Sequence, residues 1–203
     1  PADVNAQKKF EGKVNIKVTQ DDESSIIEYY LKDNKMRFEM GEEISQFSII
    51  DMAGKKIYMV IPADEIYMEV PAQGMFTAVE QNNSEVGLNR IQPTGEAKEI
   101  NGYLCEKWVY NGDEGITESW LAIDLGGFLF MDNPMGGGSK SGWQSEIESS
   151  GYFPMLIINR NNDGEEKSRY EVTSIEQESL SADLFTPPAG YQKMEMPGMD
   201  MFK

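Results

Sequence analysis

Residues 94–126 read TGEAKEINGYLCEKWVYNGDEGITESWLAIDLG and contain the pattern that decides the fold. An Asn-Gly step at 101–102 opens a segment rich in large apolar side chains, and Asn-Gly-Asp at 111–113 closes it. Such steps favour tight turns between strands. A second apolar segment, residues 116–123, follows. The stretch therefore predicts two β-strands joined by a polar turn. It also holds the single cysteine and two of the three tryptophans, namely Cys105, Trp108 and Trp120.

The chain on either side of this stretch also alternates with a period of two. Val14, Ile16 and Val18 are separated by Lys and Asn, which is typical of a strand with one wet face. Asp33-Asn34 predicts a two-residue hairpin loop, because both residue types tolerate the positive φ of such turns. The further predicted strands cover residues 10–19, 26–32, 35–40, 47–52, 57–61, 66–70, 153–160 and 165–176.

Because hairpin follows hairpin, the pattern predicts a mainly β fold with an antiparallel sheet built as a meander. We expect about ten strands in a strongly curved sheet that forms an open half-barrel. We also expect one or two short helices and long loops over the concave face. The candidate segments are Met75–Gln81, Gly126–Trp143, Trp143–Ser150 and Ser181–Phe185.

The charge balance excludes several kinds of partner. The chain of 203 residues has 35 acidic and 18 basic residues, for a formal charge of −17. That sign repels phosphate backbones, so we expect no nucleic-acid partner. The sequence has no basic cluster for anionic lipid heads. No apolar run approaches the ~20 residues that span a membrane.

The length suits one β-rich domain, which we place at residues 9–193. The polar residues 1–8 are predicted to be a tether after a cleavage or lipidation site, and the Met-rich residues 194–203 a disordered tail. The chain begins at Pro1 with no apolar leader, which fits a mature extracytoplasmic domain whose signal peptide has been removed.

The residue types argue against common catalytic chemistries. The chain has no histidine, which excludes Ser-His-Asp and Cys-His catalysis and most zinc sites. Cys105 has no partner base in sequence and is expected to be a small buried hydrophobe. The carboxylates are plentiful, but no pair stands out as a hydrolytic pair. We therefore expect a protein that is not an enzyme and holds no cofactor.

Three sequence motifs are candidates for a metal-binding or phosphate-binding site. Residues 159–164 imitate the start of a calcium loop, but Tyr170 stands where the bidentate Glu belongs, so a hairpin turn is the better interpretation. Residues 136–141 lack the Gly that a phosphate loop needs before Lys140. We assign no metal site. The weak candidates for a soft ion such as Cu(I) are the thioethers of Met194, Met196, Met199 and Met201.

Met and aromatic residues recur along the predicted strands. They form either a packed core or the adaptable wall of a cavity for an apolar ligand. Trp108 and Trp120 both stand at even-numbered positions of adjacent predicted strands, and both alternatives stay open for them. The candidate lining residues for a ligand are Trp108, Trp120, Phe128, Phe130, Met59 and Met68.

Three motifs carry a resemblance to a known family. They are INGYLCEK at residues 100–107, ESWLA at 118–122 and LFTPPAGY at 184–191. With the early hairpins, the chain resembles a family of bacterial extracytoplasmic proteins known only as a domain of unknown function. The resemblance implies a fold similar to the periplasmic lipoprotein carriers, which are open half-barrels that shelter acyl chains under a helical plug. It implies that the plug is reduced here to Met75–Gln81 and Phe128–Ser150. It supplies no functional residue.

The expected function is a non-enzymatic extracytoplasmic protein that binds a lipid, the acyl chain of a lipoprotein or another apolar ligand in the concavity of the sheet. The alternative is an envelope interaction or stress-related module whose core is filled and holds no small ligand. Soft-metal binding by the Met-rich tail is third. The sequence does not identify the ligand or the oligomeric state.

Overall fold

The computed structural model describes residues 10–40, 46–71, 91–113, 115–128, 147 and 151–195. These residues form a sheet of twelve strands and two short 3-10 helices. The first half contains β1 (Gly12–Gln20), β2 (Glu23–Lys32), β3 (Lys35–Met40), β4 (Phe47–Asp51), β5 (Lys56–Ile61), η1 (Pro62–Asp64) and β6 (Ile66–Pro71). The second half contains β7 (Ile91–Ile100), β8 (Tyr103–Gly112), β9 (Gly115–Ala122), β10 (Phe153–Asn161), β11 (Glu166–Gln177), η2 (Ala182–Phe185) and β12 (Gln192–Met194).

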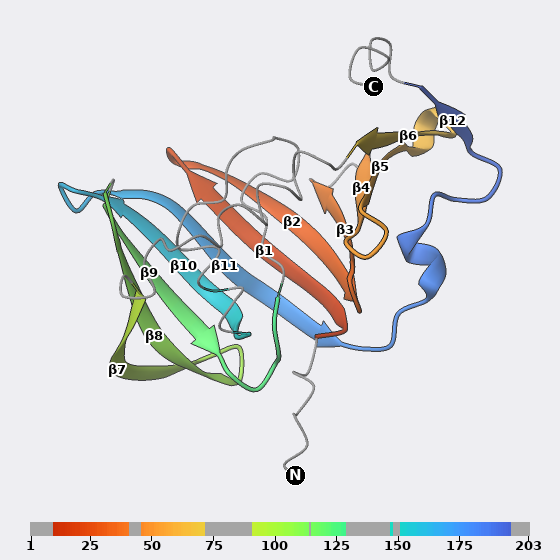
Figure 1. Cartoon of the computed structure of the whole chain (residues 1–203). Helices are drawn as coiled ribbons and strands as arrows, with labels where there is room; N and C mark the ends of the chain where they lie inside the picture. The colour runs from red at the N-terminus through yellow and green to blue at the C-terminus, as the bar shows by residue number, and fades with distance from the viewer. Residues whose placement is uncertain are drawn as a thin grey trace.

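The strand order is β12-β6-β5-β4-β3-β2-β1-β11-β10-β9-β8-β7. The sheet thus consists of two antiparallel meanders, β1–β6 and β7–β11, which are joined where β1 pairs with β11. Figure 1 shows that the sheet curves strongly without closing. The predicted mainly β, open antiparallel half-barrel is confirmed. The one parallel pair among the described strands is β12 with β6.

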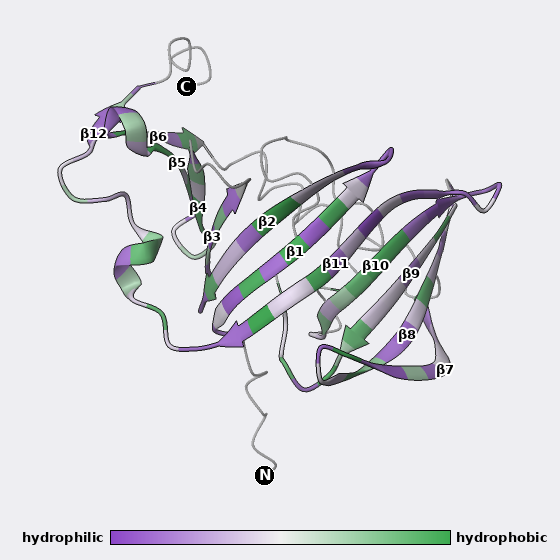
Figure 2. Ribbon diagram, turned by 180° about the vertical axis from the view of Figure 1, so that it is seen from behind, coloured by the Kyte–Doolittle hydropathy of each residue, from purple (hydrophilic) through white to green (hydrophobic). Residues whose placement is uncertain are grey.

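The period-two pattern of the sequence separates the two faces of the sheet. Val14 and Ile16 are buried in β1, while Lys17 on the opposite face is exposed. Figure 2 shows apolar and polar residues alternating along β1 and β2. The register places Val14 opposite Tyr29 and Tyr29 opposite Phe38, so these buried side chains form one row across three strands. Burial of this row stabilises the sheet by roughly 25 cal/mol per Å² of apolar surface.

The tight turns lie where the sequence predicts them. Asp33 adopts a φ of 54° in the loop between β2 and β3. Asn161 caps the β10–β11 hairpin, because its Oδ1 accepts hydrogen bonds from the backbone N–H groups of Asp163 and Glu165 at 3.0 and 2.9 Å. The hairpin interpretation of this Asn-rich turn is therefore confirmed.

The quoted stretch, residues 94–126, forms parts of three strands and not two, so that prediction was incomplete. Asn101 and Gly102, with φ of 50° and 80°, form the turn of a hairpin between β7 and β8. The preceding residues escaped prediction because Pro93, Gly95 and several charges interrupt their pattern. Asn101 also donates from Nδ2 to the carbonyl of Val172 at 2.6 Å, which ties this hairpin tip to β11.

A C-terminal strap, residues 178–191, follows β11 and leads to β12 at the other end of the sheet (Figure 1). Leu180 and Phe185 of the strap are buried against the outer face of the sheet, in a cluster with Phe47, Ile49 and Val60. Ser181 caps the predicted helical turn, η2, by accepting a hydrogen bond from the N–H of Asp183. The LFTPPAGY motif at residues 184–191 thus forms the second part of a strap that crosses β3 and β4.

Hydrogen bonds from Ser179 and Leu180 to Glu11, and from Lys32 to Leu180, attach the strap to the start of the sheet. Glu11 accepts from the backbone N–H of Leu180 at 2.9 Å, and Lys32 donates from Nζ to the Leu180 carbonyl at 2.7 Å. Lys32 also forms an ion pair with Glu11 at 2.7 Å. The beginning and the end of the domain are therefore held together on the outer face.

Candidate functional site

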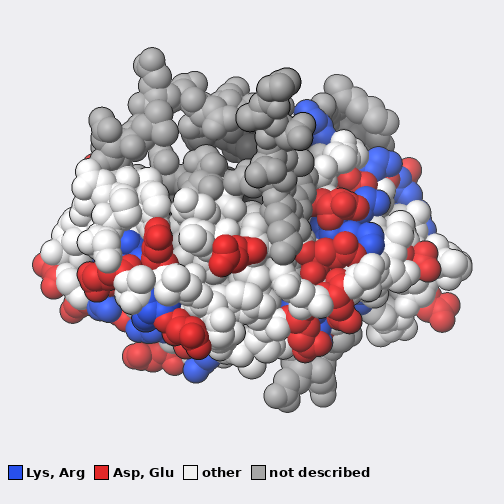
Figure 3. Space-filling view, turned by 90° about the horizontal axis from the view of Figure 1, so that it is seen from below, with Lys and Arg blue, Asp and Glu red and all other residues white. Residues whose placement is uncertain are grey.

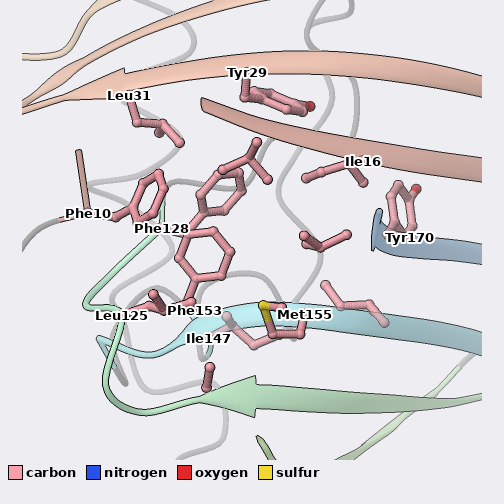
Figure 4. Packing of buried hydrophobic residues seen from close by; sticks show 14 of the residues in the cluster. Phe10, Ile16, Tyr29, Leu31, Leu125, Phe128, Ile147, Phe153, Met155 and Tyr170 are labelled. Carbon is pink, nitrogen blue, oxygen red and sulfur yellow. The ribbon is translucent and has the colours of Figure 1, made fainter. Parts of the chain in front are cut away.

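Most of the main hydrophobic cluster lies on the concave side of the sheet. Figure 4 shows Phe128, Phe153 and Ile147 between the β1–β2 and β9–β10 parts of the curved sheet. The Phe128 ring lies 5.7 Å from the ring of Tyr29 and 4.8 Å from that of Phe153. Phe10 lies 5.0 Å from Phe153. Because these side chains are almost fully buried, the centre of the concavity is filled by the chain itself.

The β4–β6 end of the concave face is less covered. The register continues the row from Phe38 to Ser48, Met59 and Met68. Ser48 is buried, whereas the two methionines are half-buried and directly opposite each other on neighbouring strands. Two of the predicted lining residues are thus adjacent and face the concave side.

The two tryptophans of the quoted stretch point to opposite faces of the sheet. Trp108 on β8 pairs with Ser119 on β9. Trp120, the residue after Ser119, pairs with Lys107, the residue before Trp108. Since directly paired residues share a face and successive residues alternate, the tryptophans cannot line one pocket together. Even numbering in both strands carries no information about the face, because the hairpin register sets the relation between them.

The surroundings of the tryptophans differ accordingly. Trp120 is on the outer face, with Lys98 Nζ 4.0 Å and Lys107 Nζ 5.8 Å from its ring centroid. Such contacts stabilise a structure and do not bind an apolar ligand. Trp108 is on the concave side, where its ring lies 5.9 Å from that of Tyr152. Its Nε1 is buried and has no hydrogen-bond partner within the described part of the chain.

The remaining candidates divide between the core and the undescribed segments. Phe128 belongs to the filled centre, with 2% of its surface exposed. Phe130 lies outside the described residues, as do Met196, Met199 and Met201 of the Met-rich tail. Met194 lies in β12 and is 47% exposed. The predicted helical segment at 75–81 and the loop from residue 129 also lie outside, except for the helical Ile147.

A polar row crosses the far end of the concave face, and sequence reasoning missed it. Thr117 donates to Asn159 Oδ1 at 2.8 Å, and Asn159 donates from Nδ2 to Ser168 Oγ at 2.8 Å. The three residues come from β9, β10 and β11, so the row depends on their register. The available signal was the alternation of each strand, which places these polar residues in phase with buried apolar ones. The two internal bonds stabilise this end of the sheet.

Ion pairs cover the outer face above the same strands. Glu118 bridges Lys107 at 3.1 Å and Arg160 at 3.2 Å. Partial burial raises the pKa of Glu118, but the hydrogen bonds from Lys107 and Arg160 outweigh this effect and hold it below its usual value. Figure 3 shows acidic and basic side chains intermingled on the face that it presents. The mixed signs indicate a solvated structural surface despite the net negative charge.

Cys105 is fully buried, as the sequence predicts. Burial raises the pKa of its thiol to about 11 from an ordinary 9.0, which lowers the thiolate fraction at neutral pH roughly a hundredfold.

We expect Ellman's reagent to modify Cys105 in the native chain at least about a hundredfold more slowly than in the urea-unfolded chain. Because the folded thiol keeps its proton longer, this group's contribution to stability is present below pH 9.0 and is lost as the pH rises to about 11. Rapid stoichiometric labelling of the native chain would contradict this expectation.

Metal and membrane sites are not evident in the described residues. There, no group of three or more Cys, Asp or Glu side chains gathers as metal ligands. The described helical segments include none with the length and hydropathy to cross a membrane.

The curved open sheet with most of its core on the concave side defines an open, mainly antiparallel half-barrel. A protein-family model described as "Domain of unknown function (DUF4412)" matches residues 10–191. The chain therefore belongs to the DUF4412 family. Comparison with curated proteins gives no match.

Solved structures share this fold at low sequence identity. An uncharacterised conserved protein from Thermus thermophilus is 11% identical with a TM-score of 0.52, over 92% of this chain and 91% of that one. MucB in the MucA/MucB complex of Pseudomonas aeruginosa is 12% identical with a TM-score of 0.56, over 87% of this chain and 55% of that one. The present chain thus spans about half the length of MucB. A structure described as a "putative outer membrane lipoprotein-sorting protein domain" from Vibrio parahaemolyticus is matched at 8% identity over 86% of this chain and 88% of that one, but its TM-score of 0.31 does not show a shared fold.

Proposed function

We propose that this chain is a non-enzymatic extracytoplasmic binding protein that takes the acyl chain of a lipid or lipoprotein at the β4–β6 end of its concave face. The observation that carries the proposal is the half-buried pair of Met59 and Met68, which continues the apolar row beyond the filled centre. Thioether side chains adapt to apolar ligands of varied shape. Burial of the acyl chain contributes roughly 25 cal/mol of binding free energy per Å² of apolar surface.

Two further observations support this reading. The fold is shared with MucB, which has been crystallised with MucA(peri), and this favours an extracytoplasmic location. The one buried carboxylate among the described residues, Glu39, accepts a hydrogen bond from Arg37 Nε at 2.8 Å. A carboxylate held in this way serves the structure.

Met68→Glu tests the site. A carboxylate on the apolar wall must be desolvated when an acyl chain enters, so we expect the affinity for a dansyl-labelled fatty acid to fall at least about tenfold. Fluorescence titration measures the affinity, and thermal melting checks that the variant is folded. Leu104→Glu on β8 is the matched control, because Leu104 is 59% exposed and remote from β6 in the sheet order. Equal affinities of both variants and the native chain would refute the site.

A second candidate is a protein-binding module with a filled core. It is favoured by Phe128, which occupies the centre of the concavity, and by the likeness to MucB, which is solved in complex with MucA. Native mass spectrometry of the purified chain separates the two. Co-purified lipid, or thermal stabilisation by added fatty acid, supports the acyl-chain site. Absence of both favours the protein-binding module.

Soft-metal binding by the Met-rich tail stays a third proposal. It is tested by Cu(I) titration of the full chain against a variant truncated after Gln192. Equal uptake by both chains would exclude the tail as the ligand.

A further inference from the structure

The two edges of the sheet are protected in different ways. β7, at one edge, contains Pro93 and a register shift between Pro93 and Ala97. Glu96, Lys98 and Glu99 add exposed charges along it. Proline, irregular pairing and charge all discourage a further strand from pairing with an edge. This edge is therefore protected by its own residues.

β6, next to the opposite edge, has few such features. It carries Ile66, Tyr67, Met68 and Val70, with Glu69 as its one charge and Pro71 only at its end. An apolar strand of this kind is a template for pairing if its edge is uncovered. Within the described chain, its outer edge is covered by β12 alone.

β12 covers β6 over a short length. Its three residues, Gln192–Met194, pair with Ile66, Tyr67 and Met68, which leaves Glu69 to Pro71 outside this register. All three are exposed. A short exposed strand opens at low free energy, because it buries little apolar surface.

The contacts that hold β12 are few and specific. The backbone N–H of Gln192 donates to the Glu65 carbonyl at 2.9 Å. Lys193 Nζ forms an ion pair with Glu69 Oε2 at 2.7 Å. The strap before it is anchored independently by the buried Leu180 and Phe185. β12 can therefore leave β6 while the strap stays in place.

We propose that the outer edge of β6 is a docking edge for an extended basic segment of a protein partner, which adds as a strand parallel to β6 in the place of β12. β12 itself indicates the chemistry of the occupant. A Lys or Arg pairs with Glu69, as Lys193 does, and an apolar residue lies opposite Met68, as Met194 does. Backbone pairing supplies the affinity and the side chains supply the specificity. The net charge of −17 favours a basic segment.

The experiment uses the full-length chain with Gln192→Pro. Proline lacks the N–H that bonds to the Glu65 carbonyl, so β12 is released while the strap anchors are untouched. The probe is a synthetic peptide of residues 189–194, AGYQKM, with an amidated C-terminus, so that its net charge is positive. Its binding is followed by amide NMR spectra of the protein, at peptide concentrations up to millimolar. We expect it to bind Gln192→Pro about tenfold more tightly than the native chain, in which β12 competes. The shifts are expected at Ile66 to Met68.

Glu195→Pro is the matched control, since it introduces the same residue just after β12 and leaves the strand paired. It should bind the peptide like the native chain. A charge exchange adds a second readout. Glu69→Lys in the Gln192→Pro background should lower the affinity for the peptide, and a peptide with Glu in place of its Lys should restore the affinity.

Three results would overturn the proposal. The first is no saturable binding by Gln192→Pro, and the second is binding that ignores the charge at position 69. The third is a Gln192→Pro dimer that the peptide cannot dissociate, which would assign the edge to a second copy of this chain. The acyl-chain site is tested by the fatty-acid titration, so the two proposals can fail separately.

Discussion

Gly115→Ala is expected to lower the free energy of unfolding by roughly 3 kcal/mol or more, as measured by urea denaturation. Gly115 begins β9 with a φ of +146°, and an added Cβ would lie 1.9 Å from the carbonyl oxygen of Arg160. The contact is with backbone of the neighbouring strand, so no side-chain rotation relieves it. Gly12 has the same geometry at the start of β1, with 2.0 Å to the Glu176 oxygen, and Gly12→Ala should behave alike.

Gly164→Ala separates this clash from the general cost of positive φ. Gly164 has a φ of +83°, but an added Cβ meets no heavy atom within 4 Å. Its expected cost is about 1–2 kcal/mol, which is the strain of a left-handed alanine alone. If Gly115→Ala and Gly164→Ala lowered the free energy of unfolding equally, this would contradict the close approach of β9 to β10 at Arg160.

Phe128→Ala is expected to cost about 3–5 kcal/mol, because it leaves a cavity between Tyr29 and Phe153 in the centre of the concavity. Chemical denaturation measures the loss. The same variant bears on function, since an apolar cavity of this size can admit a ligand. The row of residues from Met68 and Met59 leads through Ser48 and Phe38 to Tyr29, so an acyl chain bound at the β4–β6 end can extend into this cavity. We therefore expect fatty acid to stabilise Phe128→Ala more than the native chain.

Leu104→Ala is the control for this variant. Leu104 is 59% exposed, so its truncation should change the stability by no more than about 0.5 kcal/mol. A loss below about 1 kcal/mol for Phe128→Ala would contradict the filled centre. Equal stabilisation of variant and native chain by fatty acid would leave the filled centre intact and count against acyl-chain entry there.

The ten predicted strands correspond to strands in the structure, because their signals are local. In β1, Val14 and Ile16 alternate with polar residues, and Asp33 occupies the left-handed turn that its side chain tolerates. The two strands that sequence reasoning missed are β7 and β12. Pro93 and Gly95 interrupt the pattern of β7, and β12 is too short to show one. Both lie at sheet edges, where few packing constraints shape the sequence.

The candidate site was less predictable than the fold. Met59 and Met68 were recognised as apolar residues, but only the pairing of β5 with β6 makes them neighbours. Trp108 and Trp120 were grouped by their closeness in sequence, and the hairpin register separates them onto opposite faces. The polar row that contains Asn159 needs three strands in register, so no single segment reveals it.

The sequence by itself determined the strand periodicity, most turns, the buried state of Cys105 and the mainly β class. These properties depend on side-chain type and on φ preferences within a few residues. Only the tertiary structure decided the join of the two meanders at β1 and β11, the strap and the cover strand β12. Those features join segments far apart along the chain, as when Glu11 accepts from Leu180. Such contacts form when curvature and register bring distant segments together, which a period of two does not encode.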